Sequence, residues 1–254
     1  MQANFPELGA ASWPHWPHWP PSRFLATVFP QTRLHSHGMV VRDQPPDAAS
    51  LAALAPDESR RWQGFTSEKR KREWLAGRLC AYACARDILG PEYEPLFAVR
   101  DWRLENDANG RPRWSENAPE ILRATDISIS HGGEYAVAMA AARRLGVDAQ
   151  PCLAKITRIT ALFAHAGEEA LLAAALPDQD RIIRLTVLWS AKESLRKAAG
   201  LPAFLDMRLT DCKTINGGWR LRLIAWLQTA APQTATVAAT LRDNHALAFC
   251  LLDE

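Results

Sequence analysis

The chain has 254 residues, enough for one large domain or two small ones with a substantial core. Hydrophobic residues make up 48% and charged residues 23%, as in an ordinary soluble globular protein. A net charge of +2 does not indicate a nucleic-acid-binding protein, no apolar run is long enough for a membrane span, and the N-terminus lacks a signal-peptide pattern. We therefore expect a cytoplasmic protein that binds neither nucleic acid nor membrane.

The first fifty residues are rich in proline and aromatic residues, and WPHWPHWPP at 13–21 repeats Trp-Pro-His. Proline removes the backbone hydrogen bonds that a helix or a central strand would need. One interpretation is a metal-binding or peptide-recognition tract that uses His15 and His18. The interpretation we favour is an extended arm whose tryptophans pack on the domain. Residues 1–50 are thus predicted to be an N-terminal arm.

A long helix is predicted over residues 57–89, starting at the capping residue Asp57 and ending before Gly90-Pro91. Its apolar side chains recur with helical spacing and include Trp74, Leu79 and Tyr82. Cys80 and Cys84 lie four residues apart on this helix, and since the five cysteines lack metal-type CxxC spacing, we interpret them as buried free thiols. Strands are predicted at 126–130 and 134–141, with another at RLGVDAQ.

The second half of the chain repeats this arrangement. A helix is predicted over 178–199, followed by strands at 219–227, 234–242 and 245–252. EYAVAMAA at 134–141 and NHALAFCLL at 244–252 are both apolar strands that follow a polar turn and a long helix. The predicted fold class is therefore α+β, with two similar lobes at 51–145 and 146–254. Each lobe is expected to be a small antiparallel sheet packed on a long helix.

Three local patterns carry polar side chains that could form a site. Asp148 and Gln150 are two residues apart and would lie on the same face of a strand, as half of a metal site, a degraded metal site or only the end of a strand. Ser130 and His131 are neighbours on a strand, so they face opposite sides and do not form a nucleophile–base pair. Glu193 and Lys197 have the i,i+4 spacing that is also common on solvated helices.

Together and in this order, four motifs resemble those of Sfp-type 4'-phosphopantetheinyl transferases. They are GRP (110–112), SISHGGEYAVAMA (128–140), GVD (146–148) and LWSAKESLRKAAG (188–200). REWLAGR (72–78) resembles a flanking pattern of the same family, and the resemblance covers roughly residues 57–208. It implies a pseudo-dimeric fold with the active site between the lobes. It also implies a monomer that transfers phosphopantetheine from coenzyme A to a serine of an apo acyl or peptidyl carrier protein, with Mg²⁺ present, and releases 3',5'-ADP.

The resemblance also implies roles for individual residues. Asp148 and Glu193 would be metal ligands, Glu193 the base for the carrier serine, and Lys197 the group near the leaving phosphate. Residues expected to contact coenzyme A are Lys197, His131 and Arg111, assisted by Ser130, with Arg72 and Arg78 at the 3'-phosphate. Lys192 is expected to contact either phosphate or solvent. A solvated basic face is the alternative interpretation of most of the cluster Lys69, Arg70, Lys71, Arg72 and Arg78.

Two departures from the family pattern bear on the prediction. Gln150 stands where the family has a third acidic residue, so its amide oxygen is expected to face the metal or to orient a ligating water. FAHAGEE (163–169) replaces FSxxE, with Ala164 for serine and a different spacing before Glu168. Two other hypotheses remain: a non-catalytic paralogue that binds carrier proteins and has a decayed metal site, and an unrelated metal-dependent nucleotide hydrolase.

Overall fold

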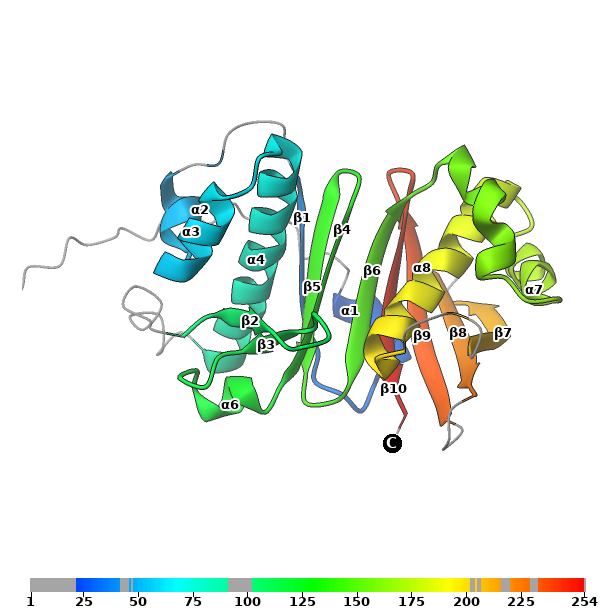
Figure 1. Ribbon diagram of the computed structural model, residues 1–254. Helices are drawn as coiled ribbons and strands as arrows, with labels where there is room; N and C mark the ends of the chain where they lie inside the picture. The colour runs from blue at the N-terminus through cyan, green and yellow to red at the C-terminus, as the bar shows by residue number, and fades with distance from the viewer. Residues whose placement is uncertain are drawn as a thin grey trace, which may run out of the picture.

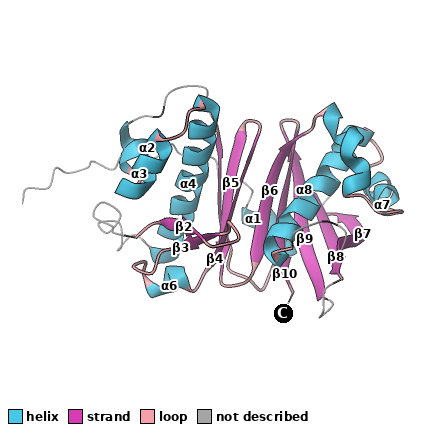
Figure 2. Cartoon of the chain, in the orientation of Figure 1, coloured by secondary structure: helices cyan, strands magenta, loops and turns pink. Residues whose placement is uncertain are grey.

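The computed structural model describes residues 22–41, 46, 48–90, 102–201, 204, 207–215, 220–228 and 233–253. The Trp-Pro-His tract lies outside these residues. Within them the chain forms two lobes side by side, each a sheet with one long helix on it (Figures 1 and 2). This arrangement confirms the predicted α+β fold of two similar lobes. None of the described helices is both long enough and apolar enough to cross a membrane.

The first lobe has a three-stranded sheet with α4 (Glu68–Leu89) packed on it. Its antiparallel strands are, in spatial order, β1 (His35–Val40), β5 (Tyr135–Ala141) and β4 (Asp126–Gly132). The smaller elements around it are α1 (Ser22–Val28), α2 (Ala48–Ala52), α3 (Pro56–Gln63), the strand pair β2 (Leu104–Asn106) and β3 (Pro112–Trp114), and α6 (Glu120–Arg123).

The single helix predicted over 57–89 is in fact two helices, α3 and α4. The first ends at Gly64, and Ser67 starts the second by accepting a hydrogen bond from the Arg70 amide at 3.3 Å. A serine cap satisfies a backbone donor that the first turn of a helix leaves free, so it favours a new start at this point.

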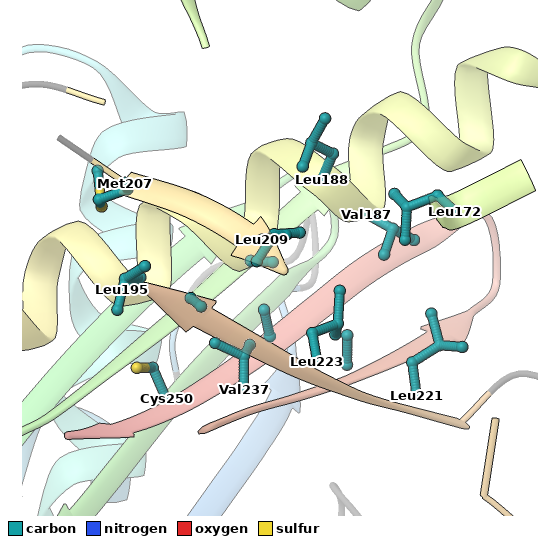
Figure 3. Packing of buried hydrophobic residues seen from close by; sticks show 14 of the residues in the cluster. Leu172, Val187, Leu188, Leu195, Met207, Leu209, Leu221, Leu223, Val237 and Cys250 are labelled. Carbon is teal, nitrogen blue, oxygen red and sulfur yellow. The ribbon is translucent and has the colours of Figure 1, made fainter. Parts of the chain in front are cut away.

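The second lobe has five antiparallel strands with α8 (Arg181–Ala199) packed on them. In spatial order they are β6 (Leu145–Pro151), β10 (His245–Leu252), β9 (Gln233–Arg242), β8 (Arg220–Leu227) and β7 (Met207–Thr214). The 3₁₀ helix η2 (Ala154–Leu162) and α7 (Glu168–Ala175) lie between β6 and α8 in the chain. Leu188 and Leu195 of α8 pack against sheet residues such as Leu223 and Val237 (Figure 3).

The two lobes share one strand order. In each lobe, the strand that precedes the long helix pairs with the last strand of the lobe, and that last strand also pairs with the strand before it in the chain. The resulting order is β1–β5–β4 in the first lobe and β6–β10–β9 in the second. The second lobe extends this unit with β8 and β7, whereas β2 and β3 form a separate pair in the first. The internal repeat predicted from the sequence is therefore present in the topology.

Residues 22–40 belong to the folded lobes, although we predicted an arm over 1–50. Strand β1 pairs with β5 from His35 opposite Ala140 to Val40 opposite Tyr135. Helix α1 buries Phe24 and Leu25 in a cluster with side chains of β5, β6 and β10, on the face of the second sheet opposite α8. The prediction failed because HSHGMV lacks the apolar alternation of a strand; its pairing to β5 and its packing against α4 hold it there.

The lobes meet where β4 and β6, which belong to different sheets, run next to each other; we call this contact the lobe junction. Alternate side chains of β4 accept hydrogen bonds from alternate backbone amides of β6. Ser128 Oγ accepts from Val147 N at 3.1 Å, and Ser130 Oγ accepts from Ala149 N at 3.3 Å. Because strand side chains alternate, DISIS presents these polar groups on one face. The junction fixes the position of β4 relative to β6.

Candidate active site

Three of the predicted site residues meet at the lobe junction: Ser130 of β4, Asp148 of β6 and Lys197 of α8. Lys197 Nζ donates to Asp148 Oδ1 at 2.9 Å, to Ser130 Oγ at 3.0 Å and to the Val147 carbonyl oxygen at 2.8 Å. The Ser130 hydroxyl donates to Asp148 Oδ1 at 3.0 Å. A carboxylate, an ammonium and a hydroxyl from three elements thus form one connected group.

The close approach of α8 to β6 depends on Gly146. A Cβ at this position would collide with the Ser194 carbonyl oxygen and would lie 2.7 Å from the Ala198 backbone nitrogen. Only a residue without a side chain lets the helix backbone come this near the strand. The glycine of GVD therefore allows Lys197 to reach the aspartate of the same motif.

The second oxygen of Asp148 is buried and has no hydrogen-bond partner among the described residues. The Asp148 side chain is only 3% exposed. A buried carboxylate oxygen without a donor is costly, and a divalent cation would satisfy it. The described residues contain no group of three or more His, Cys, Asp or Glu arranged to hold a metal. A hard cation that takes its remaining ligands from phosphates and waters is compatible with this donor set.

Glu193 lies one helical turn before Lys197 on α8, and its side chain is 13% exposed. Its Oε2 accepts from Arg196 at 2.9 and 3.2 Å. Gln150 follows Asp148 by two residues on β6 and is half-buried. The structure thus places Glu193 and Gln150 on the same two elements as Lys197 and Asp148.

His131 follows Ser130 and lies between the lobe junction and α4. Its Nδ1 is 3.7 Å from Glu73 Oε2, and its side chain is 44% exposed. Partial burial lowers the pKa of His131, and the positive charges of Lys197 and Arg70 act in the same direction, while Glu73 opposes them. The histidine is therefore mainly neutral at pH 7 and can still donate a hydrogen bond to an anion.

Arg78 and Arg72 lie on α4, and Arg78 is nearly buried. Its guanidinium lies 4.9 Å from the centre of the Trp74 ring and 3.7 Å from Glu58 Oε1, and its Nη1 has no hydrogen-bond partner among the described residues. Burial lowers the pKa of Arg78, and the negative charge of Glu58 partly offsets this shift. Arg72 is half-buried on the same helix. Arg78 is thus not part of a solvated basic face.

Lys192 is a correction to the predicted site, since it contacts neither solvent nor an open site. Its side chain is fully buried, and its Nζ lies 2.7 Å from Glu168 Oε2 and 3.1 Å from the Met207 carbonyl oxygen. Burial lowers the pKa of Lys192, and the ion pair with Glu168 opposes that shift. Glu168 also accepts from the Leu209 amide at 2.8 Å. The pair joins α7, α8 and β7 inside the second lobe.

Arg111 makes contacts other than those expected. We expected it to contact a coenzyme A phosphate, but its guanidinium points into the lobe junction. It forms a two-bond ion pair with Asp126 and also donates to the Leu145 carbonyl oxygen at 2.7 Å and to that of Lys197. Asp126 is a residue that the sequence analysis missed. Its signal was present, because Asp126, Ser128 and Ser130 are spaced by two residues on one strand face.

Glu168 was noted only as a departure from a family pattern, and its contacts show why its altered spacing is tolerated. The residue starts α7, and its Oε2 accepts from the His165 amide at 2.6 Å. The carboxylate of the first residue of α7 thus satisfies a backbone donor in the turn that precedes the helix. No sequence signal predicts its pairing with Lys192, because the two residues lie on different helices.

Comparison with known proteins agrees with this arrangement. A family model described as "4'-phosphopantetheinyl transferase superfamily" matches residues 144–250, and one described as "4'-phosphopantetheinyl transferase, N-terminal" matches residues 46–143. The chain is 35% identical over 92 residues to the holo-[acyl-carrier-protein] synthase of Anoxybacillus flavithermus, covering 36% of this chain and 74% of that protein.

Two further relatives support the same family, and one of them covers more of the chain. The enterobactin synthase component D of Salmonella typhimurium is 29% identical over 185 residues, which is 70% of each protein. The holo-[acyl-carrier-protein] synthase of Geobacillus sp. is 33% identical over 92 residues, covering 36% of this chain and 76% of that protein. The chain therefore belongs to the 4'-phosphopantetheinyl transferase superfamily and is an enzyme that transfers the phosphopantetheinyl group of coenzyme A.

Proposed function

We propose that this enzyme transfers 4'-phosphopantetheine from coenzyme A to a serine hydroxyl of an apo acyl or peptidyl carrier protein, with Mg²⁺, and releases 3',5'-ADP. The observation that carries the proposal is the group at the lobe junction, where Asp148 has one oxygen paired with Lys197 and one that no described residue satisfies. The names of the relatives, holo-[acyl-carrier-protein] synthase and enterobactin synthase component D, support the carrier as acceptor.

In the proposed reaction the serine oxygen forms a bond to the β-phosphorus of coenzyme A, and the bond from that phosphorus to the bridging oxygen breaks. The serine proton must leave as the new bond forms, and negative charge grows on the departing phosphate. Such reactions depend mainly on positioning and charge neutralisation. Bound Mg²⁺, held by Asp148 and Glu193 with Gln150 nearby, would supply positive charge at the pyrophosphate.

The residues of the chain would accept the serine proton, stabilise the departing phosphate and bind the other phosphates of coenzyme A. Glu193 accepts the serine proton directly or through a water, a role for a carboxylate within hydrogen-bond reach. Lys197 stabilises the departing phosphate, and Ser130 and Asp148 hold its ammonium in place. His131 donates a hydrogen bond to a phosphate. Arg72 binds the 3'-phosphate together with Arg78, whose Nη1 has no partner among the described residues.

Two features favour this reaction over a nucleotide hydrolase or a non-catalytic paralogue. Leu153, which is 43% exposed, directly precedes η2, and Leu162, which is 65% exposed, is the last residue of η2, the element that follows β6. Exposed apolar side chains of this size suit a protein substrate more than a nucleotide. The connected group of Ser130, Asp148 and Lys197 argues against decay, because Asp148 keeps a buried oxygen with no donor among the described residues, a cost that a bound cation would offset.

The test is to incubate the enzyme with coenzyme A, Mg²⁺ and several apo carrier proteins and to measure the intact mass of each carrier. A mass gain equal to phosphopantetheine on a carrier serine is expected. Asp148→Asn and Glu193→Gln should each lower kcat by about 10²–10³-fold, the usual effect of removing one group that stabilises the transition state.

The matched control is Glu169→Gln, which removes a 42%-exposed carboxylate paired with Arg181 and should leave the rate unchanged. Absence of any mass gain on every carrier would refute the proposed acceptor. Near-normal rates in Asp148→Asn or Glu193→Gln would refute the roles given to these carboxylates.

A further inference from the structure

The loop between β2 and β3 holds Arg111 in a fixed backbone position. The Arg111 amide donates to Asp107 Oδ1 at 2.9 Å, and the Asp107 amide donates to the Arg111 carbonyl oxygen at the same distance. Gly110, with φ of +81°, makes the turn between them. Since the backbone is anchored at both groups, the Arg111 side chain projects from a rigid base.

The guanidinium of Arg111 makes four hydrogen bonds, all within the protein. Its Nε donates to Asp126 Oδ1 at 2.9 Å, and its Nη2 donates to Asp126 Oδ2. Its remaining bonds go to the carbonyl oxygens of Leu145 and Lys197. The Arg111 and Asp126 side chains are only 14% and 16% exposed. An arginine with five N–H donors has little capacity left for a phosphate.

The Arg111–Asp126 pair forms hydrogen bonds with both the amide and the carbonyl of Leu145, the first residue of β6. The Leu145 amide donates to Asp126 Oδ2 at 2.9 Å, while the Leu145 carbonyl accepts from Arg111 at 2.7 Å. Leu145 is three residues before Asp148 on the same strand. The pair thus fixes the start of the strand that carries the site carboxylate.

The same pair holds the end of α8. The last carbonyls of a helix lack partners within the helix, and the amides of Gly200 and Leu201 both bond to the Arg196 carbonyl. Arg111 donates to the Lys197 carbonyl instead, a favourable place for a cation at a helix C-terminus. The residue whose Nζ contacts Asp148 and Ser130 is therefore held at its backbone by the first lobe.

We propose that the Arg111–Asp126 pair is a positioning device that sets the distance between Asp148 and Lys197, and that Arg111 does not bind a coenzyme A phosphate. One ion pair from the first lobe fixes both elements that bring the two groups together, β6 and α8. Small displacements of reacting groups are costly, about 10²-fold in rate for about 1 Å. The inference rests on the proposed function, because it assumes that Asp148 and Lys197 act in the transfer.

The test compares Arg111→Lys, Asp126→Asn and the double variant in the full chain. Arg111→Lys keeps the charge but loses the two-bond pair and the bonds to both carbonyls. We expect each single variant to lower kcat at least tenfold, with KM for coenzyme A within threefold of wild type. The double variant should be no worse than the poorer single variant, because residues that act as a unit are not additive.

The matched control is Arg113→Lys, two residues away on β3. Arg113 is 55% exposed and lies 3.5 Å from Glu105, so its replacement should change neither kcat nor KM. Two measurements do not depend on transfer: hydrogen exchange of the peptide covering 143–152, and the dissociation constant of coenzyme A from calorimetry. Exchange should accelerate in both single variants while the dissociation constant stays within threefold.

These readouts separate the possible failures. A wild-type enzyme that modifies no carrier refutes the proposed function, yet exchange and coenzyme A binding still test the positioning role. A raised coenzyme A dissociation constant in Arg111→Lys, with Asp126→Asn like wild type, overturns the proposal in favour of a phosphate contact. A variant that stays folded with normal kcat also overturns it, even if its urea midpoint is lower.

Discussion

Asp148 of the second lobe and His37 of the first occupy the same position in the two repeats. Asp148 pairs across the sheet with Ala248 and His37 with Ala138, and these two alanines are equivalent in the shared strand order. Each strand residue is bonded to the long helix of its lobe: Asp148 forms an ion pair with Lys197 at 2.9 Å, and His37 Nε2 lies 2.8 Å from Asp87 Oδ2.

The helix residues are equivalent as well. Lys197 lies seven residues after Ser190, whose hydroxyl bonds the Ala246 carbonyl, and Asp87 lies seven residues after Cys80, whose thiol bonds the Ala136 carbonyl. The repeats thus keep a contact between a carboxylate and a side-chain nitrogen at one place, with the carboxylate on the strand in the second lobe and on the helix in the first. Only the second pair lies at the lobe junction, because β6 runs next to β4, whereas β1 is the outer edge of the first sheet.

This equivalence supplies a control within the molecule. Lys197→Met should lower kcat by about 10²-fold, as expected when a charged group that stabilises the transition state is removed. Asp87→Asn removes the repeat-related pair, which is partly exposed and contributes about 0–1 kcal/mol. Its kcat should stay within twofold of wild type. Equal losses in the two variants would contradict the assignment of the site to the lobe junction.

Gly146→Ala should destabilise the protein. The added Cβ collides with the Ser194 carbonyl, and overpacking of this kind costs about 1–3 kcal/mol of unfolding free energy. Urea unfolding measures the change. In Gly64→Ala the new Cβ meets its nearest atom at 3.5 Å, so that variant should stay within about 0.5 kcal/mol of wild type. A Gly146→Ala variant as stable as wild type would show that α8 can move away from β6 at little cost.

Lys192→Met should lower the free energy of unfolding by about 3–5 kcal/mol, because it leaves Glu168 as an unpaired buried charge. Adding Glu168→Gln removes that charge and should restore part of the loss. Chemical denaturation of the two variants measures both effects. If Lys192 instead contacted a phosphate, the single variant would keep normal stability and show a raised KM for coenzyme A.

Coenzyme A binding should raise the pKa of His131 and so take up a proton. In the free enzyme the pKa of this histidine lies below 6.5, so it is neutral above that value and becomes protonated only as the pH falls. A phosphate beside it stabilises the protonated form, so affinity should rise as the pH falls from 7 to 6. Calorimetry in buffers of different ionisation enthalpy measures the uptake. His131→Gln should remove it, and an unchanged uptake in that variant would exclude this histidine from the phosphate site.

Gln150→Glu should keep full activity and lower the Mg²⁺ concentration needed for half-maximal rate. A carboxylate in place of the amide adds negative charge two residues from Asp148, and cation affinity rises with the charge of its ligands. Titration of the transfer rate with Mg²⁺ measures the shift. Gln233→Glu, at the exposed start of β9, is the control. A large loss of turnover in Gln150→Glu would mean that the amide has a role of its own.

Much of the fold follows from local sequence. The strand predicted at 245–252 has the same bounds as β10, and the helix predicted over 178–199 is α8, capped by Asp180 and ended by Gly200. These elements carry strong periodicity and local start and stop signals. The local signals for strand β1 and for the break between α3 and α4 are weak. Strand β1 depends on its pairing with β5, and the break depends on the Ser67 cap.

The sequence by itself determined the family, the two-lobe fold and the motif residues Asp148, Glu193 and Lys197, because ordered motifs and side-chain periodicity are local properties of the chain. Only the tertiary structure decided what each charge faces. Lys192 and Arg111 lie in the same kinds of motif as Lys197, yet Lys192 is buried against Glu168 and Arg111 against Asp126. Their partners are far away in sequence, and the free energy of a charge depends on its neighbours in space.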